Sequence, residues 1–381
     1  MCNPILIIAS VLSLLLEFTA CLAEEALADG VPDPKFSNIN LSQFAQEQLP
    51  SGPALTFHYS RPGSRYIRIH LRDISIPKGY LLTITGDAES PDYVLSGPAS
   101  FKELYPPLAT GGTVKIQISG TEPTQARLTV ANIIPQQTNP NPWLSIFEGN
   151  QLANINIASK DIPLVRASRS VVFLSFEKEG ENKVCSGFVI SRNTIITNNH
   201  CIDDVETCKT ADIVFDYTKD DRGNIVFGDQ RRCLYLVEQD KILDYSILQV
   251  DQPIAEEYAP LQWLTTQPSA ALATKLIQHP AGEWKQISEI GCEILEVGVP
   301  GVDLKVHSDL THRCDTIGGS SGSPLLAVMG AGASARYCVV GLHHWGFDQG
   351  TPFFATRNRA VMAQLLVKSL LTKGVEFNTC N

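Results

Sequence analysis

A glycine- and serine-rich stretch near the C-terminus constrains the local backbone most strongly. It reads Gly318-Gly319-Ser320-Ser321-Gly322-Ser323-Pro324. Glycines on both sides of this serine pair predict a turn tight enough for several backbone N–H groups to converge on one point. Such a turn can hold a nucleophile beside an anion-binding site. Gly/Ser clusters also form ordinary turns, so the chemical interpretation depends on partners elsewhere in the chain.

Length and charge limit the classes of protein to consider. The chain has 381 residues, enough for two or three domains, and its 27 Gly and 23 Pro favour a turn-rich β architecture. The net charge of −10 argues against nucleic acid and anionic membranes as partners.

Residues 1–23 predict an export signal peptide. The apolar run from Ile5 to Leu16 is too short to span a bilayer, and the small residues after it fit cleavage after Ala23. An alternative is a bacterial lipoprotein box over residues 18–21, in which Cys21 is lipidated and anchors the protein to a membrane. We therefore expect a secreted, extracellular or periplasmic protein, with a membrane-anchored lipoprotein as the alternative.

The cysteine count supports export. Ten cysteines become eight once the signal is removed, and all eight lie in the C-terminal half. An even number in an exported chain predicts up to four disulfides. The absence of a CxxC pair argues against a zinc cluster, so neither a metal nor another cofactor is expected. The eight cysteines are Cys185, Cys201, Cys208, Cys233, Cys292, Cys314, Cys338 and Cys380.

Hydrophobic patterning divides the mature chain into an N-terminal segment (24–53), a small β-sandwich (54–135), a linker (136–163) and a C-terminal domain (164–381). Period-two alternation over 66–71, 81–85, 114–118 and 126–130 predicts the sandwich strands. The C-terminal domain shows β-type segments at 171–174, 187–190, 195–196, 213–215 and 245–248. Apolar residues from Val361 to Leu371 recur at helical spacing, with Gly374 as the cap. His58 and His70 are interpreted as ordinary strand residues.

Two sites upstream of the serine turn could supply the base and the acid that a nucleophilic serine needs. His200 follows the apolar strand 194–196 and precedes Cys201, so a Cys185–Cys201 bridge would fix its loop. Asp244 opens the buried strand 245–248, where a carboxylate needs a partner such as an imidazole N–H. Asp240 is a weaker candidate for the acid, because no strand pattern follows it. The order His, Asp, Ser is that of the chymotrypsin-type double β-barrel and differs from subtilisins and α/β-hydrolases.

These motifs carry a family resemblance. Residues 164–380 resemble chymotrypsin-type, trypsin-like serine endopeptidases, most closely the bacterial glutamyl and lysyl endopeptidases. The motifs concerned are 185–187, 197–201, 244–248, 319–324 and 341–346. The resemblance implies an all-β fold, a double six-stranded β-barrel with a C-terminal helix, and hydrolysis of protein or peptide substrates by a monomer. It assigns His200, Asp244 and Ser321 as the triad, and the N–H groups of Gly319 and Ser321 as the oxyanion hole.

The resemblance leaves the specificity open. Asp315 stands six residues before Ser321, where the trypsin pattern keeps the acid that selects Lys or Arg at P1. Thr316 and His343 match positions with which glutamyl endopeptidases bind a substrate carboxylate. A basic P1 residue is favoured and an acidic one is the alternative, because a Cys292–Cys314 bridge could turn Asp315 away. Trp345 and Gly346 are expected to form the pocket wall and to pair with the substrate backbone.

Further expectations concern regulation and pairing. Ser320 stands where trypsin-like zymogens keep an aspartate, so their activation switch should be absent, while Arg166 and Arg169 could be cleavage points. Pairs Cys208–Cys233 and Cys338–Cys380 are assigned by elimination, and His307 and His312 are interpreted as structural. The sandwich could be a docking module for carbohydrate or protein, or an intramolecular chaperone. The alternative function for the whole chain is a catalytically silent binding or adhesion module.

Overall fold

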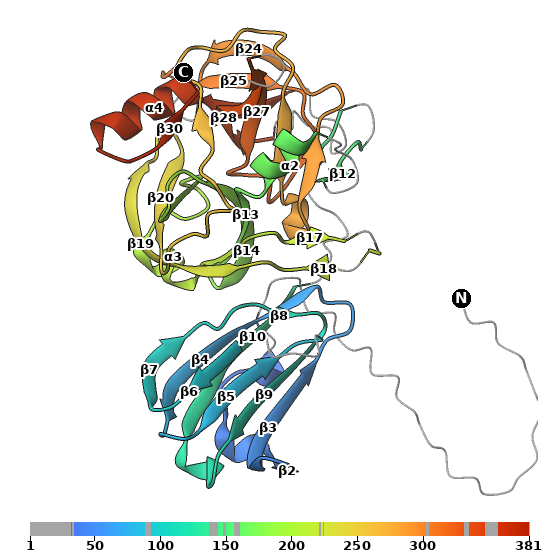
Figure 1. Ribbon diagram of the computed structural model, residues 1–381, viewed down its shortest axis with the longest axis vertical. Helices are drawn as coiled ribbons and strands as arrows, with labels where there is room; N and C mark the ends of the chain where they lie inside the picture. Colours follow the sequence, from blue (N-terminus) through green and yellow to red (C-terminus); the bar gives the residue numbers. More distant parts are fainter. Residues whose placement is uncertain are drawn as a thin grey trace, which may run out of the picture.

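The structure is a computed structural model of the chain (Figure 1). It describes residues 32, 34–87, 93–136, 144–147, 150–155, 161–220, 222–223, 225–301, 305–330, 335–346 and 357–380. The expected signal peptide, its cleavage point and the lipidation candidate Cys21 lie outside these residues. In the part of the chain that the structure describes, no helix has the length and apolar character needed to cross a membrane.

Two antiparallel sheets face each other in the N-terminal half. One sheet contains β1 (Ile39–Asn40), β10 (Arg127–Gln136), β4 (Tyr66–Ile76) and β7 (Ala99–Leu104), with β8 (Ala109–Thr110) also paired to β4. The other contains β2 (Ala45–Leu49), β3 (Gly52–Ser60), β9 (Thr113–Ser119), β5 (Leu81–Thr85) and β6 (Tyr93–Ser96). Short 3₁₀ helices are η1 (Pro34–Phe36), η2 (Leu41–Gln43) and η3 (Pro123–Gln125). Strands β1 and β2 lie in the N-terminal segment (24–53), before the expected start of the sandwich.

Side-chain alternation on β4 explains how this strand contacts both the sandwich core and the following domain. Ile67, Ile69 and Leu71 point into the core between the two sheets and are fully buried. Because successive side chains alternate across a strand, Tyr66 and Arg68 point away from that core. Tyr66 packs edge-on against Phe173 of the following domain, 5.7 Å between ring centroids. One strand therefore serves both the sandwich core and its contact with the rest of the molecule.

The next part of the chain closes into a six-stranded barrel. Its strands, in order around the barrel, are β13 (Val171–Lys178), β14 (Glu181–Val189), β15 (Thr194–Thr197), β20 (Tyr245–Val250), β19 (Gln230–Asp240) and β16 (Asp212–Val214). Helix α3 (Val205–Thr210) and the hairpin of β17 (Thr218–Lys219) and β18 (Ile225–Val226) lie outside the barrel order. The strands expected in this region are present, although β13 ends four residues after its expected end and β14 begins six residues before its expected start.

A ten-stranded sheet forms the C-terminal part. Its order is β12 (Ala153–Asn154), β23 (Gln286–Ser288), β22 (Lys275–Gln278), β27 (Pro324–Met329), β28 (Arg336–Trp345), β29 (Asn358–Met362), β25 (Asp309–His312) and β24 (Ile294–Val299). Strand β21 (Gln262–Trp263) pairs with β28, and β30 (Asn378–Thr379) pairs with β21. A bridge between Ala273 and Glu293 joins the chain before β22 to the chain before β24. This bridge closes the six strands from β22 to β24 into a second ring, so the expected all-β, double-barrel class is confirmed.

Helices are few and short. Besides α3 and η1–η3, the described residues form α2 (Ile162–Ser168), α4 (Ala363–Thr372) and the 3₁₀ turn η4 (Pro280–Gly282). The C-terminal helix α4 is present as expected, and Gly374 follows it with φ 69°. Its predicted start was two residues early, because Val361 and Met362 belong to β29. Apolar residues at this spacing fit the end of a buried strand as well as the first turn of a helix.

The segment expected as a linker contributes two short strands, each of which pairs with a strand of the C-terminal part of the chain. Strand β11 (Leu144–Ser145) pairs with β26 (Thr316–Ile317), directly before the Ser321 turn. Strand β12 pairs with β23 farther along. Residues 144–145 and 153–154 are therefore part of the fold that carries the serine turn.

A buried ionic contact joins the sandwich to the first barrel, and Figure 1 shows the two parts stacked end to end. The Arg68 guanidinium, 1% exposed, lies 2.9 Å from Asp212 Oδ2, and Asp212 is equally buried. It also donates to Asn182 Oδ1 (2.9 Å), the Thr210 carbonyl (2.5 Å) and the Ser175 carbonyl. All these acceptors belong to the barrel side of the contact.

All four disulfides have the expected pairing. They are Cys185–Cys201, Cys208–Cys233, Cys292–Cys314 and Cys338–Cys380. The first ties the His200 loop to β14, and the third ends one residue before Asp315. Two of the four cross-links therefore lie beside residues of the candidate site.

Candidate active site

The loop that carries His200 is held on both sides. Strand β15 ends at Thr197, whose hydroxyl donates to the Ser186 carbonyl at 2.8 Å. The Asn198 side chain donates to the Asp244 carbonyl at 2.9 Å. Together with the Cys185–Cys201 bridge, these bonds fix the direction of the His200 side chain, which remains 40% exposed.

Asp244 is the acid that contacts His200. Its Oδ1 accepts the His200 backbone N–H (2.9 Å), and its Oδ2 lies 2.8 Å from His200 Nδ1. The residue has φ 45°, a strained value for a non-glycine residue. Burial alone would raise the pKa of Asp244, but hydrogen bonds from His200 and His344 outweigh it and lower the pKa well below its usual range. Asp240, the rival acid, instead caps the backbone N–H groups of Ile242 and Leu243.

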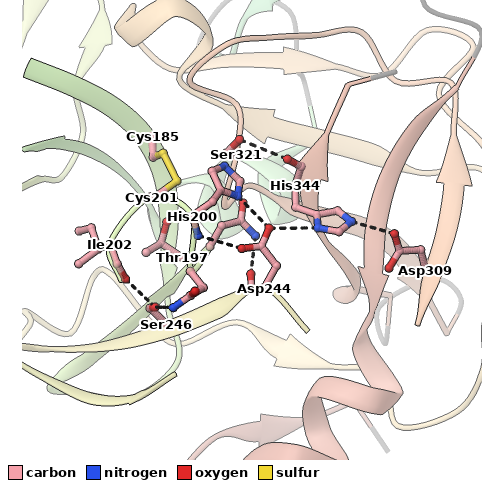
Figure 2. Close-up of polar contacts among 12 residues, drawn as sticks. Cys185, Thr197, His200, Cys201, Ile202, Asp244, Ser246, Asp309, Ser321 and His344 are labelled. Atoms are coloured by element: carbon pink, nitrogen blue, oxygen red, sulfur yellow. Dashed lines mark hydrogen bonds and ion pairs between the residues drawn. A yellow bond between two sulfur atoms is a disulfide. The ribbon is translucent and has the colours of Figure 1, made fainter. Parts of the chain in front are cut away.

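The Ser321 turn places its hydroxyl beside the His200 ring (Figure 2). Ser321 Oγ donates a long bond of 3.5 Å to the His344 carbonyl. Ser320 is fully buried, and its hydroxyl accepts the Ile317 N–H at 3.0 Å. The Ser320 hydroxyl therefore bonds within the turn itself. Trypsin-like zymogens have an aspartate at this position, which takes part in their activation switch.

Gly319 supplies the backbone shape of the turn. Its φ of 98° is one that L side chains rarely adopt, and a Cβ there would lie 2.9 Å from the His279 carbonyl oxygen. Among the described residues, neither the N–H of Gly319 nor that of Ser321 donates to a protein acceptor. Two unpaired N–H groups beside a serine hydroxyl can bind a developing oxyanion.

Asp315 is engaged by the chain before the first barrel. Its Oδ1 accepts the Phe147 N–H at 2.7 Å and its Oδ2 accepts the Gln151 N–H at 2.9 Å. Burial raises the pKa of Asp315 although both backbone bonds oppose the shift. Both carboxylate oxygens therefore already have donors, a situation that the local sequence did not predict.

The remaining expected pocket residues gather on β26 and β28. Thr316 is buried and paired with Ser145. His343 is buried, with its Nδ1 3.1 Å from His312 Nε2. Trp345 is 49% exposed, and its ring centroid lies 6.0 Å from that of His200. Gly346 follows Trp345 at the end of β28. Burial, together with the charge of His344, lowers the pKa of His312 to about 3.

Two polar residues at this site, His344 and Asp309, were missed by sequence reasoning. His344 bridges Asp244 and Asp309, with both ring nitrogens facing carboxylate oxygens. His312, interpreted as structural, contacts His343. The adjacent histidines 343 and 344 on one strand were the available signal, since alternation sends them to opposite faces.

One group of described residues has the composition of a metal site. Cys185, His200 and Cys201 lie within 4.8 Å of one another. The two sulfurs are bonded to each other, so neither offers a free thiolate, the form that binds a metal. This set does not fit a metal ion.

Arg169, a candidate cleavage point, forms an ion pair with Asp216 at 2.8 Å.

The sequence matches a known domain family over this region. Residues 185–331 match the family described as "Trypsin-like peptidase domain". This stretch begins at the first cysteine of the His200 bridge and ends after β27. The match supports a serine peptidase.

Curated relatives share less of the chain. "Secreted RxLR effector protein 73" of Plasmopara viticola is 28% identical over 226 residues, which cover 55% of this chain and 51% of that protein. "Uncharacterized protein y4fB" of Sinorhizobium fredii is 25% identical over 179 residues, covering 42% of this chain and 27% of that protein. The chain thus spans about half, or less, of the length of these relatives.

Solved structures with similar folds include serine endopeptidases. The serine endoprotease from Yersinia pestis is 19% identical with a TM-score of 0.40, over 55% of this chain and 65% of that chain. A Glu endopeptidase in complex with MPD is 14% identical with a TM-score of 0.43, over 60% of this chain and 98% of that chain.

Proposed function

We propose that the protein is a secreted serine endopeptidase. The observation that carries the proposal is the pair of contacts from Asp244 to the backbone and ring of His200, with Ser321 beside that ring. Ser321 Oγ attacks the scissile carbonyl while His200 Nε2 accepts its proton. His200 then donates that proton to the leaving amine. Asp244 holds the Nδ1–H tautomer and stabilises the imidazolium.

The oxyanion of the tetrahedral intermediate lies against the N–H groups of Gly319 and Ser321. Each such donor typically contributes about 3–4 kcal/mol to stabilising the transition state. Substrates are proteins or peptides, which add a strand beside Trp345 and Gly346 through main-chain hydrogen bonds. A Lys or Arg at P1 is selected when Asp315 is free of its backbone donors. With Asp315 still engaged, Thr316 and His343 select an acidic P1 residue.

A fluorophosphonate probe and a peptide library test the two parts of this proposal. We expect Ser321 to be the labelled residue, found by mass spectrometry of the modified peptide, because only an activated serine reacts with the probe. We expect the library to return basic P1 residues in the processed enzyme. The absence of labelling in oxidised, processed protein would refute the peptidase. A uniform P1 profile would refute the pocket assignment alone.

A further inference from the structure

His344 contacts the proposed triad and is a titratable group to which the proposed mechanism gives no role. Its side chain is 1% exposed, and Figure 2 shows its ring between two carboxylates. Nδ1 lies 3.1 Å from Asp244 Oδ2, and Nε2 lies 2.9 Å from Asp309 Oδ2. Asp309 is itself fully buried and accepts the Ser308 hydroxyl at 2.8 Å on its other oxygen.

The geometry limits the charge state of this ring. A neutral imidazole donates from only one nitrogen, whereas an ionised carboxylate can only accept. Both nitrogens face carboxylate oxygens, so the contacts are satisfied by an imidazolium between two carboxylates. The charged or titratable groups around the ring are Asp244, Asp309, Arg359 (3.9 Å from Asp309 Oδ2), His200, His312 and His343. With the three other histidines neutral, two anions face two cations and the buried cluster is balanced.

We propose that His344 is a positioning residue, a buried imidazolium that holds Asp244 in place and offsets its charge. The proposal rests on the proposed peptidase function. Asp244 Oδ2 is shared between His200 and His344, so loss of His344 frees the carboxylate to rotate. The cation also reduces the negative field on His200. Without it, His200 binds its proton more tightly and becomes an active base only at higher pH.

The first test measures the charge of His344 without requiring hydrolysis. Imidazole ¹⁵N spectra of the full chain carrying Ser321→Ala should show one ring that is still protonated on both nitrogens at a pH where an ordinary imidazole is neutral. That signal should vanish in His344→Gln. In Asp309→Asn the ring should titrate, because the asparagine amide can donate to a neutral Nε2. A neutral His344 ring at pH 7 in the parent spectrum would overturn the proposal.

The second test measures pH dependence. His344→Gln should move the acid limb of kcat/KM to higher pH by about one unit and lower kcat about tenfold or more. His307→Gln is the matched control, because that ring is exposed and bonds only the Gly298 carbonyl. A folded His344→Gln protein with an unshifted limb would overturn the proposal. Fluorophosphonate labelling of Ser321 reports separately on the peptidase function itself.

A different set of contacts concerns the specificity pocket. Strand β11 places Leu144 opposite Ile317 and Ser145 opposite Thr316. On the other side, a Cβ on Gly346 would lie 2.1 Å from Ser145 Oγ. The Asn358 amide donates to the Ser145 carbonyl at 3.3 Å. Residues 144–147 therefore run between the two strands proposed as the walls of the pocket.

The same segment reaches Asp315 through the Phe147 N–H. Ser145 and Ile146 are buried, at 7% and 5% exposure. A substrate side chain in contact with Thr316, Gly346 and Asp315 would need the space that this segment fills. We infer that residues 144–147 occupy the primary pocket and hold the intact chain latent until they are displaced. This inference also rests on the proposed function.

Ile146→Asp tests this latency in the full chain. A buried carboxylate is costly, so the variant should release the segment and raise kcat/KM for a peptide substrate about tenfold or more. Ile162→Asp is the matched control, because Ile162 is 71% exposed. Labelling by a small ethoxy fluorophosphonate, which needs no pocket, should stay within about threefold among all three proteins.

Distinct outcomes separate the hypotheses. Equal peptide hydrolysis by wild type and a folded Ile146→Asp protein would refute the latency, whereas failed labelling of all three would refute the peptidase. If Ile146→Asp does not fold, hydrogen exchange replaces it. In full-chain Ser321→Ala, a bound substrate peptide should remove protection of the Phe147 and Gln151 amides. Unchanged protection with peptide bound would refute the latency.

Discussion

Ser321→Ala should lower kcat for peptide hydrolysis by about 10⁶-fold, and His200→Ala should lower it about as much. The double variant should lose little more, because a nucleophile and its base act as one unit. The residual rate should remain above that of water, since the N–H groups of Gly319 and Ser321 still bind the oxyanion. Initial rates at matched concentrations of folded protein measure these losses.

Ser323→Ala is the matched control for the serine turn. Ser323 is fully buried, and its hydroxyl has no hydrogen-bond partner among the described residues. Its loss should leave kcat unchanged, because only its backbone atoms bond Ser320 and His343. Near-wild-type kcat in the Ser321→Ala protein would show that another group carries the reaction.

Arg68→Met should lower the free energy of unfolding by about 3–5 kcal/mol, the usual effect of removing one partner from a buried ion pair. Asp212 would keep only Arg232 as a cation partner, and the carbonyls of Ser175 and Thr210 would lose their donor. Urea unfolding followed by tryptophan fluorescence measures the change. Most of the loss should fall on the contact between sandwich and first barrel.

Two comparisons make the Arg68 result interpretable. Arg72→Met changes an arginine on the same strand, whose contact with Asn38 is exposed, and should cost under about 1 kcal/mol. Arg68→Met with Asp212→Asn should recover part of the loss, because the unpaired buried charge is removed. Equal stability of Arg68→Met and wild type would show that this ion pair contributes nothing to the contact between sandwich and first barrel.

The proposed active-site triad and the disulfides could be read from the sequence because their signals are local. A serine between glycines, a histidine beside a cysteine at a strand end, and an aspartate opening an apolar strand each mark a short stretch of backbone. Their order along the chain then selected the double barrel. The start of α4 was misplaced because Val361 and Met362 have a pattern shared by buried strands and helices.

The sequence by itself determined which residues could form a nucleophile, a base and an acid, and which face of β4 is apolar. Only the tertiary structure decided the partners of the buried polar groups. Asp315 is engaged by Phe147, 168 residues away, Asp244 is shared with His344, 100 residues away, and Arg68 meets Asp212 across two domains. Burial makes every such group require a partner, but the choice among distant candidates depends on how the strands pack.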